Sequence, residues 1–455
     1  MNVARRARVA PLLLFAVLLA SCATLGPGGG APVPPGAPQG RGEPGHQTPA
    51  VVPPLELDRE PSIEVGLALD LDVLTLEPLA PVRLEHQGAS GAASTQAGTT
   101  PITARAEAGG IRVGWKGGRA VWLLSGRDTL IVHGAQAGSP DDPSRVRWNG
   151  KTWRGTFKIF LNPRGRLTLA AHLPLETYLL GVVPGEIGAL ADDQLEAGRA
   201  QAIAARSYTL FYRGRRAAEG FDLYGTVEDQ LYSPVESERP LATRCVESTH
   251  GRFALSGGQP IRANYCSTCG GITAEVWEAW PATSLPYLVS HLDHGSGDYC
   301  AASPQYRWRE EWTAEKFTAT VARFAPAQGV ALPAGGIGDL VDARVDERSR
   351  SGRAWRLVVV TTTGEITIPA YSIRQVLRRP SAGNGSAILR SNLFKLDVRR
   401  DPATRRVLAV VVSGAGSGHG VGLCQTGALG MARTGKSAEQ ILMHYYRGVE
   451  LKRLY

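Results

Sequence analysis

The sequence has no uninterrupted apolar stretch that could cross a bilayer as a helix, which needs about 20 residues. It also lacks a dense cluster of basic residues. Its 50 Lys and Arg residues are scattered, although they outnumber the 41 acidic residues and give a net charge of +9. The excess favours an anionic partner such as a cell-wall polymer or a membrane surface. The scatter argues against nucleic acid, which we do not expect as a partner.

The first 22 residues are typical of a lipoprotein signal peptide. Three arginines precede the apolar run of residues 11–20, which is too short for a membrane anchor but suits a signal peptide. The run ends at Leu19-Ala20-Ser21-Cys22, which resembles a bacterial lipobox with Cys22 as the lipidated residue. We therefore expect an exported protein that is lipid-anchored to the cell envelope. The residue after Cys22 is Ala23 and not Asp. The resemblance to a lipobox then implies that the lipoprotein is sorted to the outer membrane in a cell that has one. The alternative is a plain secretory signal.

Residues 23–55 are rich in Gly and Pro and poor in large apolar side chains, so they cannot bury enough surface to fold. We expect a disordered tether that lets an anchored domain reach the cell wall. The remaining residues, about 400, allow two or three domains.

Short strand-like segments separated by Gly- and Ser-rich turns dominate residues 56–150 and predict a β-rich N-terminal region. A hairpin follows at residues 157–170. Further strands are expected at 252–255, 261–265, 355–360, 365–368 and 407–412, and helices at 242–248, 314–324 and 437–447. The pattern predicts an α+β fold, rich in strands and with few helices.

Residues 173–213 carry the strongest helical pattern. Apolar residues at helical spacing predict a first helix that breaks at Pro184-Gly185, because proline disfavours the helical region for the residue before it. Asp193 and Glu196 form a capping-box pattern that predicts the start of a second helix. Glu186 is therefore expected in a short loop between two helices, where a carboxylate could be held for acid–base catalysis. A solvated loop glutamate is the plainer interpretation.

Four motifs resemble, in the same order, those of the SpoIID/LytB family of peptidoglycan lytic transglycosylases and amidase enhancers. They are LPLETYLLGVVPGE (173–186), EAGRAQAIAARSY (196–208), NYCSTCGG (264–271) and GHGVGLCQTGA (418–428). The resemblance extends from about residue 152 to Tyr455. It implies that residues 151–455 form a two-lobed catalytic domain whose second lobe lies near residues 310–410.

The resemblance also implies a chemistry. Glu186 occupies the position of the family's catalytic glutamate, which implies a lytic transglycosylase that cleaves glycan strands without stem peptides and leaves 1,6-anhydro-muramyl ends. One glutamate suffices as acid and then base, because the C6 hydroxyl of the sugar replaces water as the nucleophile. Its pKa must be raised, most simply by desolvation. No cofactor is required for this reaction.

Other motif residues are expected on the substrate side of the site. His419 lies in a glycine-rich loop and Gln425 follows it, and both can form hydrogen bonds with sugar groups. Gln201 and Arg206 match the family's second motif. They either line the same cleft or pair with a buried carboxylate.

The cysteines leave two alternatives open. Cys266, Cys269, Cys300 and Cys424 lie in or near the motifs and could form a closed structural zinc site, whereas export favours disulfides. Some family members bind zinc through a histidine-containing set, and here Cys266 stands where many relatives have histidine. Cys245 is expected to be a small buried residue on a helix.

Two other functions remain open. The amidase-enhancer branch implies a noncatalytic wall-binding protein that activates an N-acetylmuramoyl-L-alanine amidase. A hydrolase that uses water and a second carboxylate is a third reading. The expected partners are peptidoglycan glycan strands, a membrane through the lipid anchor and, for the second reading, a cell-wall amidase.

Overall fold

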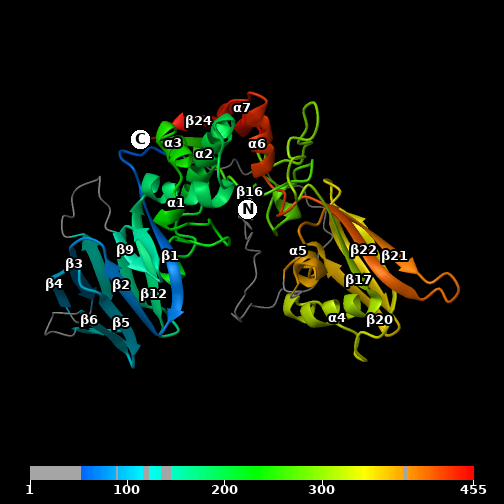
Figure 1. Cartoon of the computed structure of the whole chain (residues 1–455), viewed down its shortest axis with the longest axis horizontal. Helices are drawn as coiled ribbons and strands as arrows, with labels where there is room; N and C mark the ends of the chain where they lie inside the picture. The colour runs from blue at the N-terminus through cyan, green and yellow to red at the C-terminus, as the bar shows by residue number, and fades with distance from the viewer. Residues whose placement is uncertain (1–52, 89–90, 116–121, 135–144, 384–386) are drawn as a thin grey trace, which may run out of the picture.

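The computed structural model describes residues 53–88, 91–115, 122–134, 145–383 and 387–455. The predicted signal peptide, Cys22 and all but the last three residues of the tether lie outside these ranges. Figure 1 shows β-sheets at one end, a group of helices in the middle and a second lobe at the other end. The α+β prediction is confirmed. In the ranges described, none of the helices combines the length and apolarity needed to cross a membrane.

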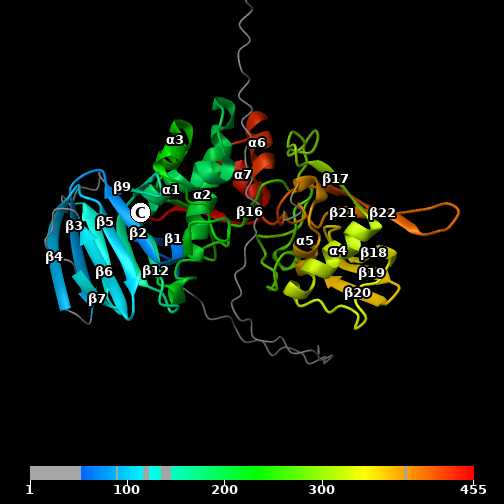
Figure 2. The same cartoon turned by 60° about the horizontal axis from the view of Figure 1, so that its bottom comes forward.

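Two sheets form the N-terminal end, and alternate residues of both sheets bury their side chains in a common core. The first has the order β13 (Leu223–Tyr224), β1 (Ser62–Leu71), β12 (Leu167–Pro174), β11 (Thr156–Leu161), β8 (Thr129–Gly134), β3 (Val82–Gly88), β4 (Gly91–Gly98). The second has the order β10 (Lys151–Arg154), β9 (Arg145–Trp148), β2 (Val73–Pro78), β5 (Ile102–Glu107), β6 (Gly110–Trp115), β7 (Trp122–Ser125). Both are visible edge-on in Figure 2.

These sheets cross the domain boundary that we expected at residue 150. β1 pairs antiparallel with β12 along most of its length, and β2 pairs with β9. Strands from both sides of residue 150 therefore share one hydrogen-bonded structure, and the N-terminal region is not a separate unit. The β11–β12 hairpin leads directly into the first helix.

The helices of the middle part are α1 (Leu175–Ile187), α2 (Leu195–Phe211), α3 (Pro240–Ser248), α6 (Gln425–Arg433) and α7 (Ala438–Tyr445). α2 lies at the centre of this group, and its small residues, including Ala200 and Ala204, are fully buried against its neighbours. A small sheet of β15 (Gln259–Pro260), β14 (Arg252–Ser256) and β24 (Glu450–Arg453) packs beside it. The expected helix around Cys245 is confirmed, with that residue buried.

The predicted helix break at Pro184-Gly185 is wrong. α1 continues through Pro184 to Ile187, and the amide of Gly188 donates to the carbonyl oxygen of Pro184 over 3.2 Å. A proline this close to a helix end removes one backbone donor without preventing the last turn. Glu186 therefore lies in the last turn of α1 and not in a loop.

The predicted capping box at Asp193 is also wrong. A short 3-10 turn, Asp192–Gln194, precedes α2, and the Gln194 side chain accepts a hydrogen bond from the amide of Ala191 over 2.8 Å. Glu196 instead accepts from the amide of Ala438 at the start of α7, over 2.7 Å. The carboxylate thus satisfies an N-terminal amide of a different helix.

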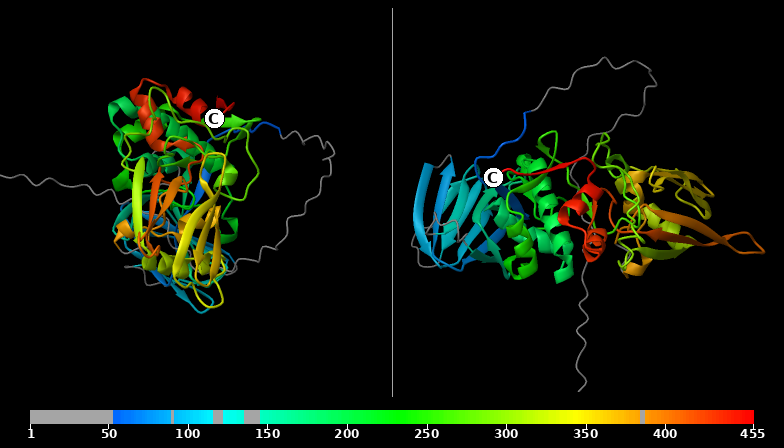
Figure 3. Two further views of the ribbon diagram at one scale, coloured as in Figure 1. Left: turned by 90° about the vertical axis from the view of Figure 1, so that its right-hand side faces the viewer. Right: turned by 90° about the horizontal axis from the view of Figure 1, so that it is seen from above.

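The second lobe has its own core, which runs in sequence from Trp308 to Val412. It contains two three-stranded sheets and the helices α4 (Ala314–Phe324) and α5 (Ala370–Val376). The first sheet has the order β17 (Arg307–Thr313), β22 (Val407–Ala415), β21 (Phe394–Arg400). The second has the order β18 (Leu340–Arg348), β19 (Ala354–Thr361), β20 (Gly364–Pro369). The view from above in Figure 3 shows this lobe beyond α6 and α7, on the side away from the N-terminal sheets. The observed α4 matches its predicted range.

Residues 264–271 and 418–428 lie side by side where the two lobes meet. The two-residue strands β16 (Tyr265–Cys266) and β23 (Leu423–Cys424) pair in parallel. The predicted strand at 261–265 is shorter than expected because the amides of Ala263 and Asn264 bond two residues back, to Ile261 and Arg262, which curls the chain before β16.

Candidate active site

The carboxylate of Glu186 is held between two distant segments. Its Oε1 accepts a hydrogen bond from the backbone amide of Leu231 over 2.8 Å, and its Oε2 accepts from Nε2 of Gln425 over 3.4 Å. The residue is half-buried, so its contacts fix the carboxyl group while part of the side chain stays accessible.

Two glycines in α1 allow the chain around Leu231 to reach Glu186. A Cβ atom at Gly185 would lie 2.8 Å from the carbonyl oxygen of Leu231, and one at Gly181 would lie 2.6 Å from that of Ser233. The amide of Ser233 also donates to the carbonyl of Gly181 over 3.2 Å. The glycine before the glutamate in this motif therefore serves close packing.

Burial raises the pKa of Glu186 to about 7, and hydrogen bonds from Leu231, Gln425 and Tyr265 oppose that rise. The contacts of Glu186 within the described ranges are with amide, hydroxyl and backbone groups, and none is with a carboxylate or a basic side chain. A carboxyl group with this pKa can donate a proton near neutral pH and accept one afterwards.

Tyr265 was not predicted as a site residue. Its hydroxyl lies in the site beside Glu186 and accepts a hydrogen bond from Nε2 of Gln230 over 3.0 Å. Gln230 is buried and also donates to the carbonyl of Ala205, while its Oε1 accepts from Thr209 over 2.7 Å. Because Gln230 donates to the tyrosine oxygen, the hydroxyl proton of Tyr265 is free to point to Glu186. Its position beside Cys266 in NYCSTCGG could have identified it.

His419 lies in the same region, in the predicted glycine-rich loop. Burial lowers its pKa to about 3, with further lowering by nearby arginines, so the ring is neutral at pH 7. Its Nδ1 accepts a hydrogen bond from the amide of Val421 over 3.0 Å, and the ring centroid lies 4.7 Å from that of Trp280. The guanidinium of Arg262 lies 4.9 Å from the Trp280 ring centroid. Trp280 and Arg262 were not predicted as site residues either.

Arg206 pairs with a buried carboxylate and does not line a cleft. Its side chain has no exposed surface and binds Glu176 through both carboxylate oxygens, over 2.8 and 2.6 Å. Gln201 is also fully buried, and its amide group has no hydrogen-bond partner among the described residues. Of the four residues predicted on the substrate side, the structure places Gln425 and His419 in the region of Glu186, and it buries Arg206 and Gln201 inside the helical core.

Three of the four predicted cysteine ligands come together. Cys269, Cys300 and Cys424 are buried with Asp293, which was not predicted, and the potential ligand atoms of these four residues lie within 4.8 Å of one another. Cys266 pairs with Cys424 through the backbone but is outside this group. The five cysteines in the described ranges carry free thiols, and the 3.8 Å between the sulfur atoms of Cys269 and Cys300 exceeds a disulfide bond of about 2.05 Å.

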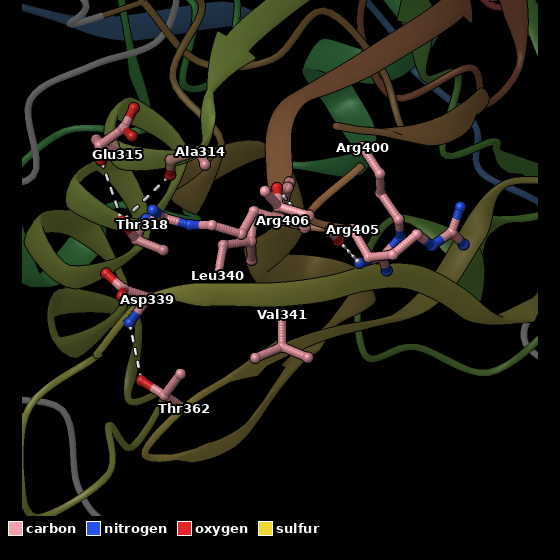
Figure 4. Close-up of a pocket in the computed structure, with 12 residues that line it drawn as sticks. Ala314, Glu315, Thr318, Asp339, Leu340, Val341, Thr362, Arg400, Arg405 and Arg406 are labelled. Carbon is pink, nitrogen blue, oxygen red and sulfur yellow. Dashed lines mark hydrogen bonds between the residues drawn. The ribbon is translucent and has the colours of Figure 1, made fainter. Parts of the chain in front are cut away.

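A separate cavity of about 450 Å³ lies in the second lobe and includes no predicted site residue. Figure 4 shows Arg400 and Arg405 on one side, Glu315 and Asp339 on the other, and Arg406 between them with its side chain directed toward Thr318 and Glu315. Arg400 is held by Asp342 over 2.7 Å. The mixture of charges gives this cavity no clear preference for an anionic ligand.

The fold and site together define a two-lobed α+β protein with a half-buried glutamate whose pKa is raised. The family profile described as Stage II sporulation protein matches residues 163–255, and a domain of unknown function (DUF8618) matches residues 292–422. The first match contains Glu186 and α2, and the second ends inside the His419 loop. The first match supports the resemblance to the SpoIID/LytB family that the four motifs indicated.

Relatives in bacteria agree with this assignment. The chain is 28% identical over 298 residues to Stage II sporulation protein D of Bacillus subtilis, a match that covers 62% of this chain and 75% of the relative. It is 26% identical over 313 residues to an uncharacterized protein of Brachyspira hyodysenteriae, covering 67% and 73%. It is 26% identical over 350 residues to the amidase enhancer of Bacillus subtilis, covering 68% and 45%.

Proposed function

We propose that this protein is a peptidoglycan lytic transglycosylase with Glu186 as the general acid and base. The observation that carries the proposal is the environment of that carboxyl group. Burial raises its pKa to about 7, and its hydrogen-bond donors are neutral. The match to the Stage II sporulation protein family and the similarity to a Bacillus amidase enhancer support a role at the cell wall.

In the first step, the protonated carboxyl of Glu186 donates its proton to the glycosidic oxygen. The bond from this oxygen to C1 of the muramyl sugar breaks, and the sugar develops oxocarbenium character. In the second step, the Glu186 carboxylate takes the proton of the C6 hydroxyl of that sugar while its oxygen bonds to C1. The product is a 1,6-anhydro end, no water is consumed and Glu186 is protonated again.

The lack of a carboxylate among the contacts of Glu186 in the described ranges favours this route over hydrolysis. A retaining hydrolase needs a second carboxyl about 5 Å from the first, and an inverting one needs it about 6.5–9.5 Å away. Glu176, the other carboxylate of α1, is bound to Arg206.

Trp280, Arg262 and His419 are the side chains we expect to contact the glycan. The indole ring offers an apolar face for a sugar ring, and a neutral His419 can exchange hydrogen bonds with sugar hydroxyl or acetamido groups. Their adjacency, with ring centroids of Trp280 and His419 4.7 Å apart, supports one continuous surface for this purpose.

Product analysis tests the reaction. Denuded glycan strands are incubated with the wild-type chain and with Glu186→Gln, and the ends are identified by mass spectrometry. Anhydro-muramyl ends are expected with the wild type and at least about 100-fold fewer with Glu186→Gln, since an acid–base group contributes about 10²–10⁴-fold. Glu228→Gln, at an exposed position, is the matched control. Reducing ends instead of anhydro ends would show a hydrolase, and equal products from Glu186→Gln would exclude Glu186 as the acid.

The second candidate function is activation of a cell-wall amidase without catalysis, supported by the relative named amidase enhancer. On this reading, the purified chain binds glycan and raises the rate of an N-acetylmuramoyl-L-alanine amidase, and Glu186→Gln does so equally well. The transglycosylase reading predicts instead that any stimulation depends on Glu186, since cleaved glycan would be the cause.

We also propose that the protein is exported and anchored through lipid on Cys22. The lipobox-like residues 19–22 support this proposal. Cys22→Ser should move the protein from the membrane fraction to the soluble fraction without changing the activity of the purified chain.

A further inference from the structure

Four buried side chains from three separate segments point into one site. Cys269 follows β16, Asp293 and Cys300 come from the next long loop, and Cys424 ends β23. Their potential ligand atoms all lie within 4.8 Å of one another. Exposure of these four residues is 1% or less. Such convergence of three sulfur atoms and a carboxylate requires an explanation other than general packing.

The neighbours of Cys424 favour a negatively charged sulfur. Its Sγ accepts hydrogen bonds from the amides of Cys269 and Gly427, over 3.1 and 3.3 Å. Cys424 is also the N-cap residue of α6, where the helix dipole favours negative charge. Two backbone donors on one sulfur suit a thiolate better than a thiol, which is a weak acceptor.

The neighbours of Asp293 orient one of its oxygens into the site. Oδ1 accepts from the hydroxyl of Tyr445 over 2.8 Å and lies 3.1 Å from Nε2 of His444. Oδ2 faces the sulfur atoms and lies 3.1 Å from Sγ of Cys269. Carboxylate ligands of metals are commonly held by such outer hydrogen bonds.

A buried carboxylate beside thiolates needs a compensating positive charge. Among the described residues, His444 is the one basic side chain paired with Asp293. A disulfide between Cys269 and Cys300 would supply no charge and would leave Cys424 and Asp293 buried beside it. A divalent cation would satisfy all four groups.

The spacing and the ligand types fit zinc. With zinc–sulfur bonds of about 2.3 Å in a tetrahedral site, two sulfur ligands lie about 3.8 Å apart, and the sulfur atoms of Cys269 and Cys300 are 3.8 Å apart. Calcium and magnesium take oxygen ligands. We propose that Cys269, Asp293, Cys300 and Cys424 bind one zinc ion in a closed structural site.

The site differs from the all-cysteine set that the sequence predicted, because Asp293 takes the place of Cys266. It joins the loop after β16, the loop of residues 293–300 and the start of α6. Gln425, whose amide contacts Glu186, directly follows the ligand Cys424. The zinc ion would therefore hold in place one wall of the candidate active site, and it has no open position for a substrate.

Metal analysis of the purified full-length chain tests the site without using any activity. We expect about one zinc per chain and loss of it in Cys300→Ser, Cys424→Ser and Asp293→Ala. Cys245→Ser is the control, since Cys245 is buried on α3 outside the group, and it should keep the zinc. Retention of zinc in Asp293→Ala combined with its loss in Cys266→Ser would overturn the ligand set.

Two measurements on the wild type cover the case in which a ligand variant does not fold. Replacement of zinc by cobalt should give the sulfur-to-cobalt charge-transfer absorption and the visible bands of a tetrahedral ion. Titration of the folded protein with a mercurial thiol reagent should release the zinc as the thiols react. Wild-type protein that contains no metal and shows a Cys269–Cys300 disulfide in non-reducing peptide mapping would refute the proposal, and so would an octahedral cobalt spectrum without charge-transfer bands.

Discussion

Oε2 of Glu186 lies 3.4 Å from Nε2 of Gln425, although 239 residues separate the two in the sequence. The contact joins the last turn of α1 to the first residue of α6, so the glutamate lies where the first and the last of the four motifs meet. Because the glutamine is a neutral donor, it holds the carboxyl group without stabilising its charge as a cation would. The raised pKa of Glu186 follows from this combination of fixed position and weak charge compensation.

The pH dependence of glycan cleavage should report this pKa. The first step needs protonated Glu186, so the rate should be highest below about pH 7 and should fall above it by up to about tenfold per pH unit. Tyr265→Phe removes a hydrogen bond that lowers the pKa of Glu186, so the alkaline limb should move to higher pH. Initial rates of formation of anhydro ends from pH 5 to 9 measure both effects.

Tyr371→Phe is the control for that experiment, since Tyr371 is exposed in the second lobe and its hydroxyl bonds to the carbonyl of Trp277. Its profile should match the wild type. An alkaline limb that stays unchanged in Tyr265→Phe, or moves to lower pH, would contradict the assignment.

Glu186→Gln should change stability in a pH-dependent way. Folding raises the pKa of Glu186 from 4.5 to about 7, so its contribution to stability is fully present below about pH 4.5 and is lost as the pH rises through 7. At pH 8 the wild type buries a charge that the glutamine variant lacks. The variant should therefore gain about 2 kcal/mol in the free energy of unfolding relative to wild type between pH 5 and pH 8. Urea unfolding at both values measures this, and Glu228→Gln should show no such pH-dependent gain.

Local sequence patterns predicted the elements that local interactions determine. α4 begins at the residue after Thr313, whose side chain accepts from the amide of Lys316. The helix expected at 437–447 is α7, which begins after a capping box formed by Ser437 and Gln440. The predicted set of cysteine ligands also included residues of both the cysteine motif and the segment that contains the histidine loop. The parallel pairing of β16 with β23 places these two segments together.

Features that depend on tertiary contacts could not be predicted in this way. The last turn of α1 persists beyond Pro184 while residues 231–233 pack on Gly181 and Gly185, and no local pattern reveals that partner. Asp293 joins the cysteines because its amide bonds to the carbonyl of Gly271 over 2.9 Å. A single aspartate in a long loop gives no signal of this in the sequence.

Gly422→Ala should damage the junction between the two motif segments. Gly422 has φ of 70°, and a Cβ atom there would lie 2.0 Å from the carbonyl oxygen of Asn264. The added methyl group should force β23 away from β16 and destabilise the fold by about 3 kcal/mol or more. Gly435→Ala is the matched control, because its φ is 79° but nothing lies within 4 Å of the added atom. The control should cost about 1 kcal/mol, and urea unfolding compares the two. Equal losses in both variants would show that the contact with Asn264 is not the cause.

The variant Arg206→Met distinguishes the two roles predicted for Arg206, pairing with a buried carboxylate and lining the substrate cleft. If the residue is structural, Arg206→Met leaves the Glu176 carboxylate buried without its partner and should reduce the free energy of unfolding by about 3–5 kcal/mol. Burial alone would raise the pKa of Glu176, but Arg206, together with hydrogen bonds from Tyr455 and the amide of Gly251, outweighs that effect and lowers it. The double variant Arg206→Met with Glu176→Leu should lose less stability than the sum of the two single changes.

Arg199→Met on the same helix is the control, since its ion pair with Glu196 is about one-third exposed and should contribute less than about 1 kcal/mol. A small loss of stability in Arg206→Met, together with loss of glycan binding, would instead assign Arg206 to the substrate.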